Sequence, residues 1–140
     1  MAFRPTARIV TRETIEMKHI GPDGAVVDRS CTVLMAMRRA SEAAQFFEAL
    51  RTPPVRADGQ SDEAWALTQK AAFQRLARSD ASFLKTVIVG WDEGSGIEDD
   101  DGRPLPYSPE AVDLLLDHDW FVTAAVQTYN RASSGARRGN

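Results

Sequence analysis

The stretch that decides the fold is residues 8–37, RIVTRETIEMKHIGPDGAVVDRSCTVLMAM. Two runs rich in β-branched residues flank Gly21-Pro22-Asp23-Gly24, four successive residues of the types that favour turns. This pattern predicts an antiparallel β-hairpin whose connection is longer than a two-residue turn. Part of the first run alternates, which places one set of side chains on the same side of a strand: Thr11, Glu13, Ile15, Met17 and His19.

A first helix is predicted directly after the hairpin. Ser41 is a residue type that caps helices, and Phe46, Phe47 and Leu50 follow it with the spacing of one apolar stripe. The two prolines of Thr52-Pro53-Pro54 end this helix, because proline cannot continue the helical hydrogen bonding.

A loop over residues 53–60 leads to a second predicted helix. Either Ser61 or Asp62 provides its N-cap. We expect its buried side to be built from Trp65, Leu67, Ala71, Ala72, Phe73 and Leu76.

The segment ASFLKTVIVGW, residues 81–91, carries two competing signals. Its Thr-Val-Ile-Val run at residues 86–89 has high strand propensity. The apolar residues recur with the helical period, however, and Gly90 stands where a helix C-cap would lie. We therefore predict a helix over residues 81–90, with a strand as the alternative. The residues that set the helical period are Phe83, Leu84, Val87, Ile88 and Trp91.

Residues 92–107, DEGSGIEDDDGRPLPY, predict a surface loop because they are rich in glycine, proline and acidic residues. Ser108-Pro109-Glu110 then begins a short helix, with a cap, a proline at the first position and an early acid. After Asp117-His118-Asp119, a last helix carries an apolar set: Trp120, Phe121, Ala124, Ala125 and Tyr129.

These elements define an α+β fold. We expect a single domain over residues 1–132, with the antiparallel hairpin at about 8–37 packed against about five helices at about 41–132. Residues 133–140 are small and polar, so we expect a flexible, disordered C-terminal tail.

Composition excludes several classes of protein. The chain has 140 residues, 43% hydrophobic and 26% charged, which is ordinary for one globular domain. A net charge of −3 argues against nucleic acid as a partner. The single cysteine, Cys31, allows no intrachain disulfide. No apolar run reaches the roughly 18 residues of a membrane span or the length of a signal-peptide core. We therefore expect a cytoplasmic protein without a membrane partner.

Charge is unevenly distributed along the chain. Residues 1–91 carry +3, and residues 92–140 carry −6. Such an asymmetry can steer partners or favour head-to-tail self-association. The alternative is that these charges only solvate the surface and one acidic loop.

The acidic loop does not match a metal site. Asp99, Asp101 and Gly102 would fit positions 3, 5 and 6 of an EF-hand, but Ile97 and Ser108 would then occupy positions 1 and 12, where carboxylates are needed. One cysteine and two histidines have no zinc-ligand spacing. We expect no metal and no cofactor.

No residue pattern predicts catalysis. His19 falls on a strand, His118 falls between helices, and Cys31 has no basic or histidine neighbour that would lower the pKa of its thiol. No phosphate-binding loop, dinucleotide fingerprint or nucleophile elbow is present. Trp91, Trp120 and Phe121 are candidates either for the core or for an exposed binding anchor. We expect a protein-binding protein and not an enzyme.

Residues 83–140 resemble the C-terminal part of the tail assembly chaperones of long-tailed bacteriophages and prophages. Three features carry the resemblance: the step Val89-Gly90-Trp91-Asp92, the loop DGRPLPYS at residues 101–108, and a closing helix pair with a small-residue and basic tail that ends in Asn140. The hairpin and the helix after it also resemble the N-terminal part of the family, whereas residues 51–80 form a longer middle than the family predicts.

The resemblance implies a non-catalytic factor in the cytoplasm of a bacterial host. Its partners would be the tape-measure protein, which it keeps soluble, and the tail-tube protein, whose polymerisation it promotes. The alternative is a structural tail or head–tail completion protein retained in the virion. An apolar tape-measure chain calls for apolar surface, and the expected outward-facing residues are Trp91, Leu116, Trp120, Phe121 and Tyr129. If all five were core residues, their mutation would unfold the domain instead.

Overall fold

The computed structural model describes Arg4 and residues 8–137. Within them, three antiparallel strands and five helices confirm the predicted α+β class. The elements follow the order β1 (Ile9–Ile20), β2 (Val26–Met37), α1 (Ala40–Arg51), α2 (Asp62–Ala77), α3 (Ser79–Val87), β3 (Ile88–Gly90), α4 (Pro109–Leu116) and α5 (Asp119–Arg137). No helix of this described part is both long and apolar enough to cross a membrane.

The chain divides into two compact units, where the sequence analysis expects one domain. The first unit joins the described residues up to Arg38 to those from Leu84 onward, and the second is Arg39–Phe83. The core of the first unit draws on the hairpin, the end of α3, α4 and α5. Neither α1 nor α2 contains a buried residue.

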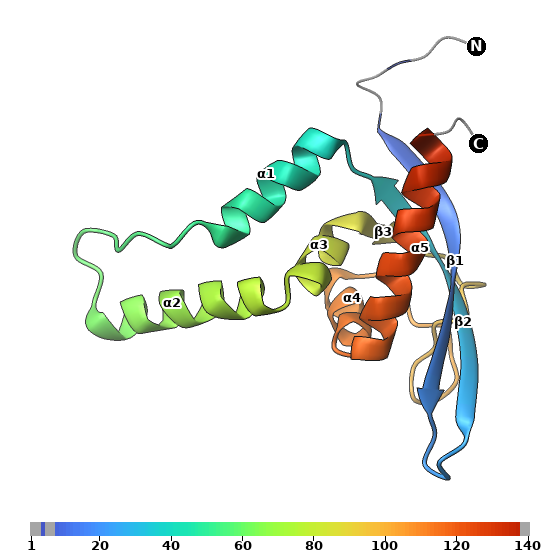
Figure 1. Cartoon of the computed structure of the whole chain (residues 1–140). Helices are drawn as coiled ribbons and strands as arrows, with labels where there is room; N and C mark the ends of the chain where they lie inside the picture. Colours follow the sequence, from blue (N-terminus) through green and yellow to red (C-terminus); the bar gives the residue numbers. More distant parts are fainter. Residues whose placement is uncertain (1–3, 5–7, 138–140) are drawn as a thin grey trace. The chain divides into compact units, whose positions relative to one another are not determined.

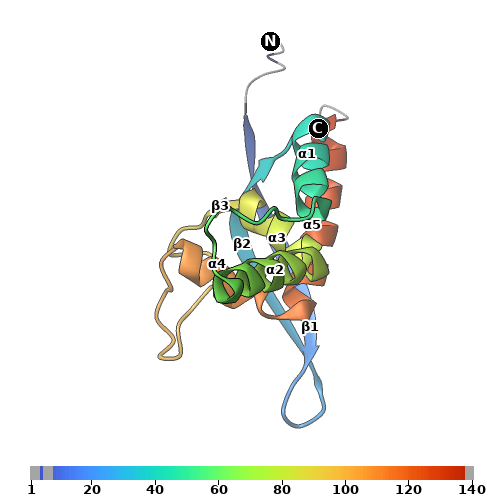
Figure 2. The ribbon, with the colours of Figure 1, turned by 90° about the vertical axis from the view of Figure 1, so that its left-hand side faces the viewer.

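The predicted hairpin is confirmed over its whole length. β1 and β2 pair without interruption from Ile9 opposite Met37 to Ile20 opposite Val26. The Gly21 amide closes the turn by donating to the Ala25 carbonyl at 2.8 Å. Gly24 adopts a φ of 80°, a conformation that glycine reaches without steric cost. The hairpin tip projects past α4 and α5 in both ribbon views (Figures 1 and 2).

One face of the hairpin forms the core of the first unit. The predicted alternation is present, because Ile15 and Met17 are buried while their neighbours in β1 are exposed. α5 runs along this face (Figure 1). Phe121 and Ala125 of α5 are buried, as are Cys31, Val33 and Met35 of β2.

The prediction of a helix over residues 81–90 is right only up to Val87. Ile88–Gly90 form β3, which pairs antiparallel with β2 through Met35 opposite Ile88 and Leu34 opposite Gly90. Gly90 is therefore a strand residue and not a helix cap. The backbone N–H and C=O groups of β3 form hydrogen bonds with β2. The spacing of apolar side chains, on which the helix prediction rests, contains no information about this pairing.

The closing helices begin as predicted. The Ser108 hydroxyl accepts from the Ala111 amide at 3.0 Å, and Pro109 occupies the first turn of α4. α5 continues to Arg137, so residues 133–137 of the expected tail lie in the helix. Residues 138–140 lie outside the described residues.

In the second unit, α1 begins one residue before Ser41, and that predicted cap is wrong. Arg39 is the N-cap, because its amide donates to the Glu42 carboxylate at 3.0 Å. α1 ends at Arg51, before the two prolines, as predicted.

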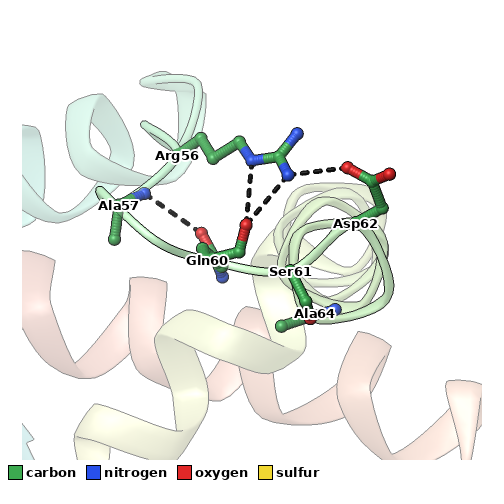
Figure 3. A network of polar contacts seen from close by, with 6 residues as sticks. All are labelled: Arg56, Ala57, Gln60, Ser61, Asp62 and Ala64. Carbon is green, nitrogen blue, oxygen red and sulfur yellow. Dashed lines mark hydrogen bonds and ion pairs between the residues drawn. The ribbon is translucent and has the colours of Figure 1, made fainter.

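The loop between α1 and α2 is fixed by a polar network (Figure 3). The Arg56 guanidinium donates to the Gln60 carbonyl at 2.8 Å and pairs with the Asp62 carboxylate at 2.6 Å. Of the two predicted caps, Ser61 is the N-cap, since its hydroxyl accepts from the Ala64 amide at 3.1 Å, and Asp62 is the first residue of the helix. These contacts fix the start of α2.

Candidate functional site

The five residues expected on an outward-facing surface do not form one. Phe121 is only 1% exposed, and Leu116 and Trp91 are also buried, so the prediction is wrong for these three. Trp120 and Tyr129 are half-buried. The reason is that α5 lies along the sheet, which directs the apolar side of the closing helix pair into the core.

Trp91 joins two parts of the chain that the sequence resemblance treats separately. Its indole Nε1 donates to the Leu105 carbonyl at 2.7 Å, and its ring meets the Tyr107 ring edge-on, with centroids 5.1 Å apart. The next residue, Asp92, pairs with the exposed Arg12 at 2.8 Å, and this contact lowers the pKa of the carboxyl. Trp91 and Asp92, of the step Val89-Gly90-Trp91-Asp92, therefore anchor the loop that follows them.

The acidic loop is only partly a surface loop. Ser95 and Ile97 are buried, and the Ser95 carbonyl accepts from the Thr32 amide of β2 at 2.8 Å. Gly96, between them, has a φ of 86°, and a Cβ there would lie 3.0 Å from the Ser30 carbonyl oxygen. Only glycine fits this close approach of loop and strand.

The carboxylate of Asp99 closes its own loop. Its Oδ1 accepts from the Asp101 amide at 2.9 Å and from the Arg103 amide at 3.0 Å. Among the described residues, no group of three histidine, cysteine or acidic side chains is arranged to hold a metal ion. The absence of a calcium or zinc site stays a prediction.

Tyr129 and Arg38 link α5 to the end of the hairpin. The Tyr129 hydroxyl accepts from the Arg38 amide at 3.2 Å, and the Arg38 guanidinium donates to the Thr86 carbonyl of α3. Tyr129 thus has a structural role inside the first unit, which explains why its side chain is turned inward.

Both histidines contact Trp120. The His19 ring stacks on the indole at a centroid distance of 4.6 Å, and the His118 ring lies 4.9 Å away. Arg29 donates from Nε to His19 Nε2 at 2.9 Å. A pocket of about 850 Å³ beside Trp120 has charged lining of both signs: Glu16, Lys18, Asp28, Arg29 and Arg131.

Cys31 is a core residue. It is buried in β2, and burial raises the pKa of its thiol to about 11. The thiol therefore stays protonated at neutral pH and is a poor nucleophile.

α2 carries an exposed apolar surface where the sequence analysis expects a buried side. Leu67, Phe73 and Leu76 are 67%, 72% and 43% exposed, and no residue of α2 is buried. The large apolar residues do not fall on one helical stripe. The half-buried side of α2 contains mainly small residues: Ala64, Trp65, Thr68, Ala71 and Ala72.

α1 differs from α2 in that its phenylalanines find partners within the second unit. The Phe47 ring stacks on Phe83 at 5.1 Å, and the Phe46 ring meets Phe83 edge-on at 5.6 Å. Within its unit, the apolar stripe predicted for α1 is therefore partly covered. We name Phe73 and Leu76, which lie one helical turn apart, the α2 apolar surface.

Comparison of the chain with protein-family models, with curated proteins and with solved structures gives no match. Two features of the chain bear on its function: the sequence resemblance of residues 83–140, and the exposed apolar side chains on α2.

Proposed function

We propose that this chain is a non-catalytic tail assembly chaperone of a long-tailed bacteriophage or prophage. It binds the tape-measure protein, keeps it soluble in the host cytoplasm and promotes assembly of the tail tube around it. The structural observation that supports this proposal best is the α2 apolar surface. The second candidate is a structural tail or head–tail completion protein that stays in the virion.

The α2 apolar surface suits a holdase because it offers large side chains that lose water only in a complex. Phe73 and Leu76 lie one helical turn apart and form a continuous patch, and Leu67 adds a second contact point. A long apolar helix, such as the resemblance implies for the tape-measure chain, is recognised by apolar anchors of this kind.

The loop before α2 supports this role. Val55, in this loop, is 88% exposed and adds apolar area beside the network of Arg56, Gln60 and Asp62 (Figure 3). A pre-formed helix start costs less ordering entropy on binding than a disordered segment. Phe73 and Leu76 follow within the helix that this network begins.

Two of the three features that carry the resemblance contact each other in the structure, through the hydrogen bond of Trp91 with Leu105 and its ring contact with Tyr107. The motifs therefore describe how the first unit folds, and the partner surface is expected elsewhere. The proposed binding site is therefore on α2 and not on the closing helix pair.

Co-expression with the tape-measure protein tests the proposal. We expect the double variant Phe73→Ala with Leu76→Ala to lose much of the soluble tape-measure protein, because each buried side chain contributes about 1.5–3 kcal/mol to an apolar contact. Leu114→Ala is the matched control, since Leu114 is similarly exposed at 63% but lies on α4 of the first unit. Circular dichroism checks that both variants keep the fold.

Two results would contradict the proposal. The first is a co-expression result: either the tape-measure protein stays fully soluble with the folded double variant, or the Leu114→Ala control loses as much soluble tape-measure protein as the double variant does. The second is detection of the chain in purified particles by mass spectrometry at the stoichiometry of a subunit, which would favour the structural alternative.

A further inference from the structure

β1 is a long, regular strand at the edge of the sheet. The strand order is β1-β2-β3, so β1 has one strand neighbour in the described part of the chain. Its 12 residues pair with β2 without a bulge and contain no proline. Proteins normally protect such edges with bulges, prolines, short strands or charged side chains, because an unprotected edge is a template for another strand. Of these devices, β1 has only charged side chains, and they are of both signs.

We propose that β1 pairs antiparallel with β1 of a second copy of this chain. The two-fold axis passes through Thr14, and the two sheets join into one continuous sheet of six strands. The interface is isologous, unlike the head-to-tail contact that the charge asymmetry of the sequence suggests. This inference does not depend on the proposed chaperone function.

Charge complementarity fixes the partner and the register. Arg12, Thr14 and Glu16 are exposed and alternate with the buried Ile15 and Met17, which places them on the opposite face of β1; we call this the outer face. Glu16 also lines the pocket beside Trp120. With the axis at Thr14, Arg12 lies opposite Glu16 of the second copy, and symmetry forms this pair twice. Directly opposed side chains of opposite charge stabilise an antiparallel pair.

Neighbouring registers are less favourable. Ile15 and Met17 are buried, so their face of β1 must be the covered face in both copies. An axis between two residues would place buried-face residues of one copy opposite outer-face residues of the other. The axis therefore passes through a residue of β1. Moving the axis to Glu13 places two Glu13 carboxylates opposite each other. Moving it to Ile15 places Arg12 opposite Lys18. Like charges in direct opposition destabilise the pair.

The ion pair of Arg12 with Asp92 does not block this contact. The Arg12 side chain is 60% exposed, and one of its nitrogens, Nη1, binds Asp92 at 2.8 Å. A guanidinium has five donors, so the remaining ones can reach Glu16 of the second copy. The outer face also continues across the sheet, because the Thr14 and Thr32 hydroxyls lie 3.1 Å apart.

Site-directed cross-linking tests the register. Under mild oxidation, Thr14→Cys is expected to form a covalent dimer on a non-reducing gel, because the two residues are directly opposite each other across the axis. Thr32→Cys is the matched control: it is the cross-strand neighbour of Thr14 on the same face, but it lies on the central strand. The wild type controls for Cys31. No dimer with Thr14→Cys, or equal dimer with Thr32→Cys, would overturn the proposal.

Charge reversal tests the pairing energy by sedimentation equilibrium. The wild type is expected to show a monomer–dimer equilibrium. Glu16→Arg should weaken dimerisation by roughly tenfold, and adding Arg12→Glu should restore it, because the pair is re-formed with the charges exchanged. A wild type that stays monomeric at all concentrations, or a dimer that Glu16→Arg leaves unchanged, refutes the interface.

Discussion

Trp91 has a role that its residue type does not reveal. Tryptophan is common at binding hot spots, and the sequence allows either an anchor or a core residue. Its indole is buried and its Nε1 hydrogen is used by the Leu105 carbonyl. A tryptophan in such a position stabilises the loop, and its apolar ring contributes area to the core.

The hydrogen bond of Trp91 can be measured by substitution. Trp91→Phe keeps an aromatic ring but leaves the Leu105 carbonyl without its donor, so we expect a loss of about 1–2 kcal/mol in the free energy of unfolding. Tyr107→Phe is the control, because it retains the ring contact and removes only the hydroxyl of a half-exposed side chain. Denaturant unfolding measures both. Equal stability of Trp91→Phe and the wild type would contradict this account.

Cys31 predicts a pH dependence of stability at alkaline pH. Burial raises the pKa of its thiol from 9.0 to about 11, so the folded state favours the protonated thiol. Its contribution to stability is therefore complete below about pH 9 and is lost as the pH rises toward 11. Unfolding free energies measured across this range should fall less steeply for Cys31→Ala. Identical slopes for the variant and the wild type would count against the raised pKa.

The elements that the sequence predicts correctly are those specified by local residues. The turn at residues 21–24 sets the hairpin, and Ser108-Pro109 sets the start of α4. Both signals act within a few residues, so the sequence alone shows them.

The elements that the sequence misses depend on distant contacts. Residues 88–90 keep the helical period of α3, yet they pair with Leu34 and Met35, more than fifty residues earlier in the chain. The start of α1 is missed for a different reason, because Glu42 reaches back to the Arg39 amide and competes with Ser41 as the N-terminal signal. Side-chain periodicity contains neither kind of information.

α2 shows the same limit for the candidate site. Its caps are local, and Ser61 is predicted correctly. Exposure of Leu67, Phe73 and Leu76 depends on what the rest of the chain covers, and an apolar residue in a helix is normally assigned to a core. The weak sequence signal for a surface was available: the apolar residues of α2 do not form one stripe.

At the scale of the whole molecule, the second unit is an insertion between two parts of the first. One core is built from residues 8–38 together with residues 84–137. Arg39–Phe83 lie between these two segments in the sequence. The long middle at residues 51–80, which departs from the family resemblance, lies inside this insertion.

This organisation predicts two levels of local stability. α2 has no buried residue, whereas Val33 of β2 and Ala125 of α5 are fully buried. Amides with little apolar burial around them exchange through local opening at low free energy, and core amides exchange only through global unfolding. In native-state hydrogen exchange, we therefore expect the amides of α2 to show a free energy of opening at least about 2 kcal/mol below those of Val33 and Ala125.

The denaturant dependence of exchange provides the control. Opening of α2 should vary weakly with denaturant, because it exposes little surface, whereas exchange at Val33 should follow the slope of global unfolding. The amide of Glu48, on α1, allows the exchange of α2 to be compared with that of another helix of the second unit. If the α2 amides exchanged with the same free energy and the same slope as Val33, the two units would unfold as one, and the expectation of two levels of local stability would be wrong.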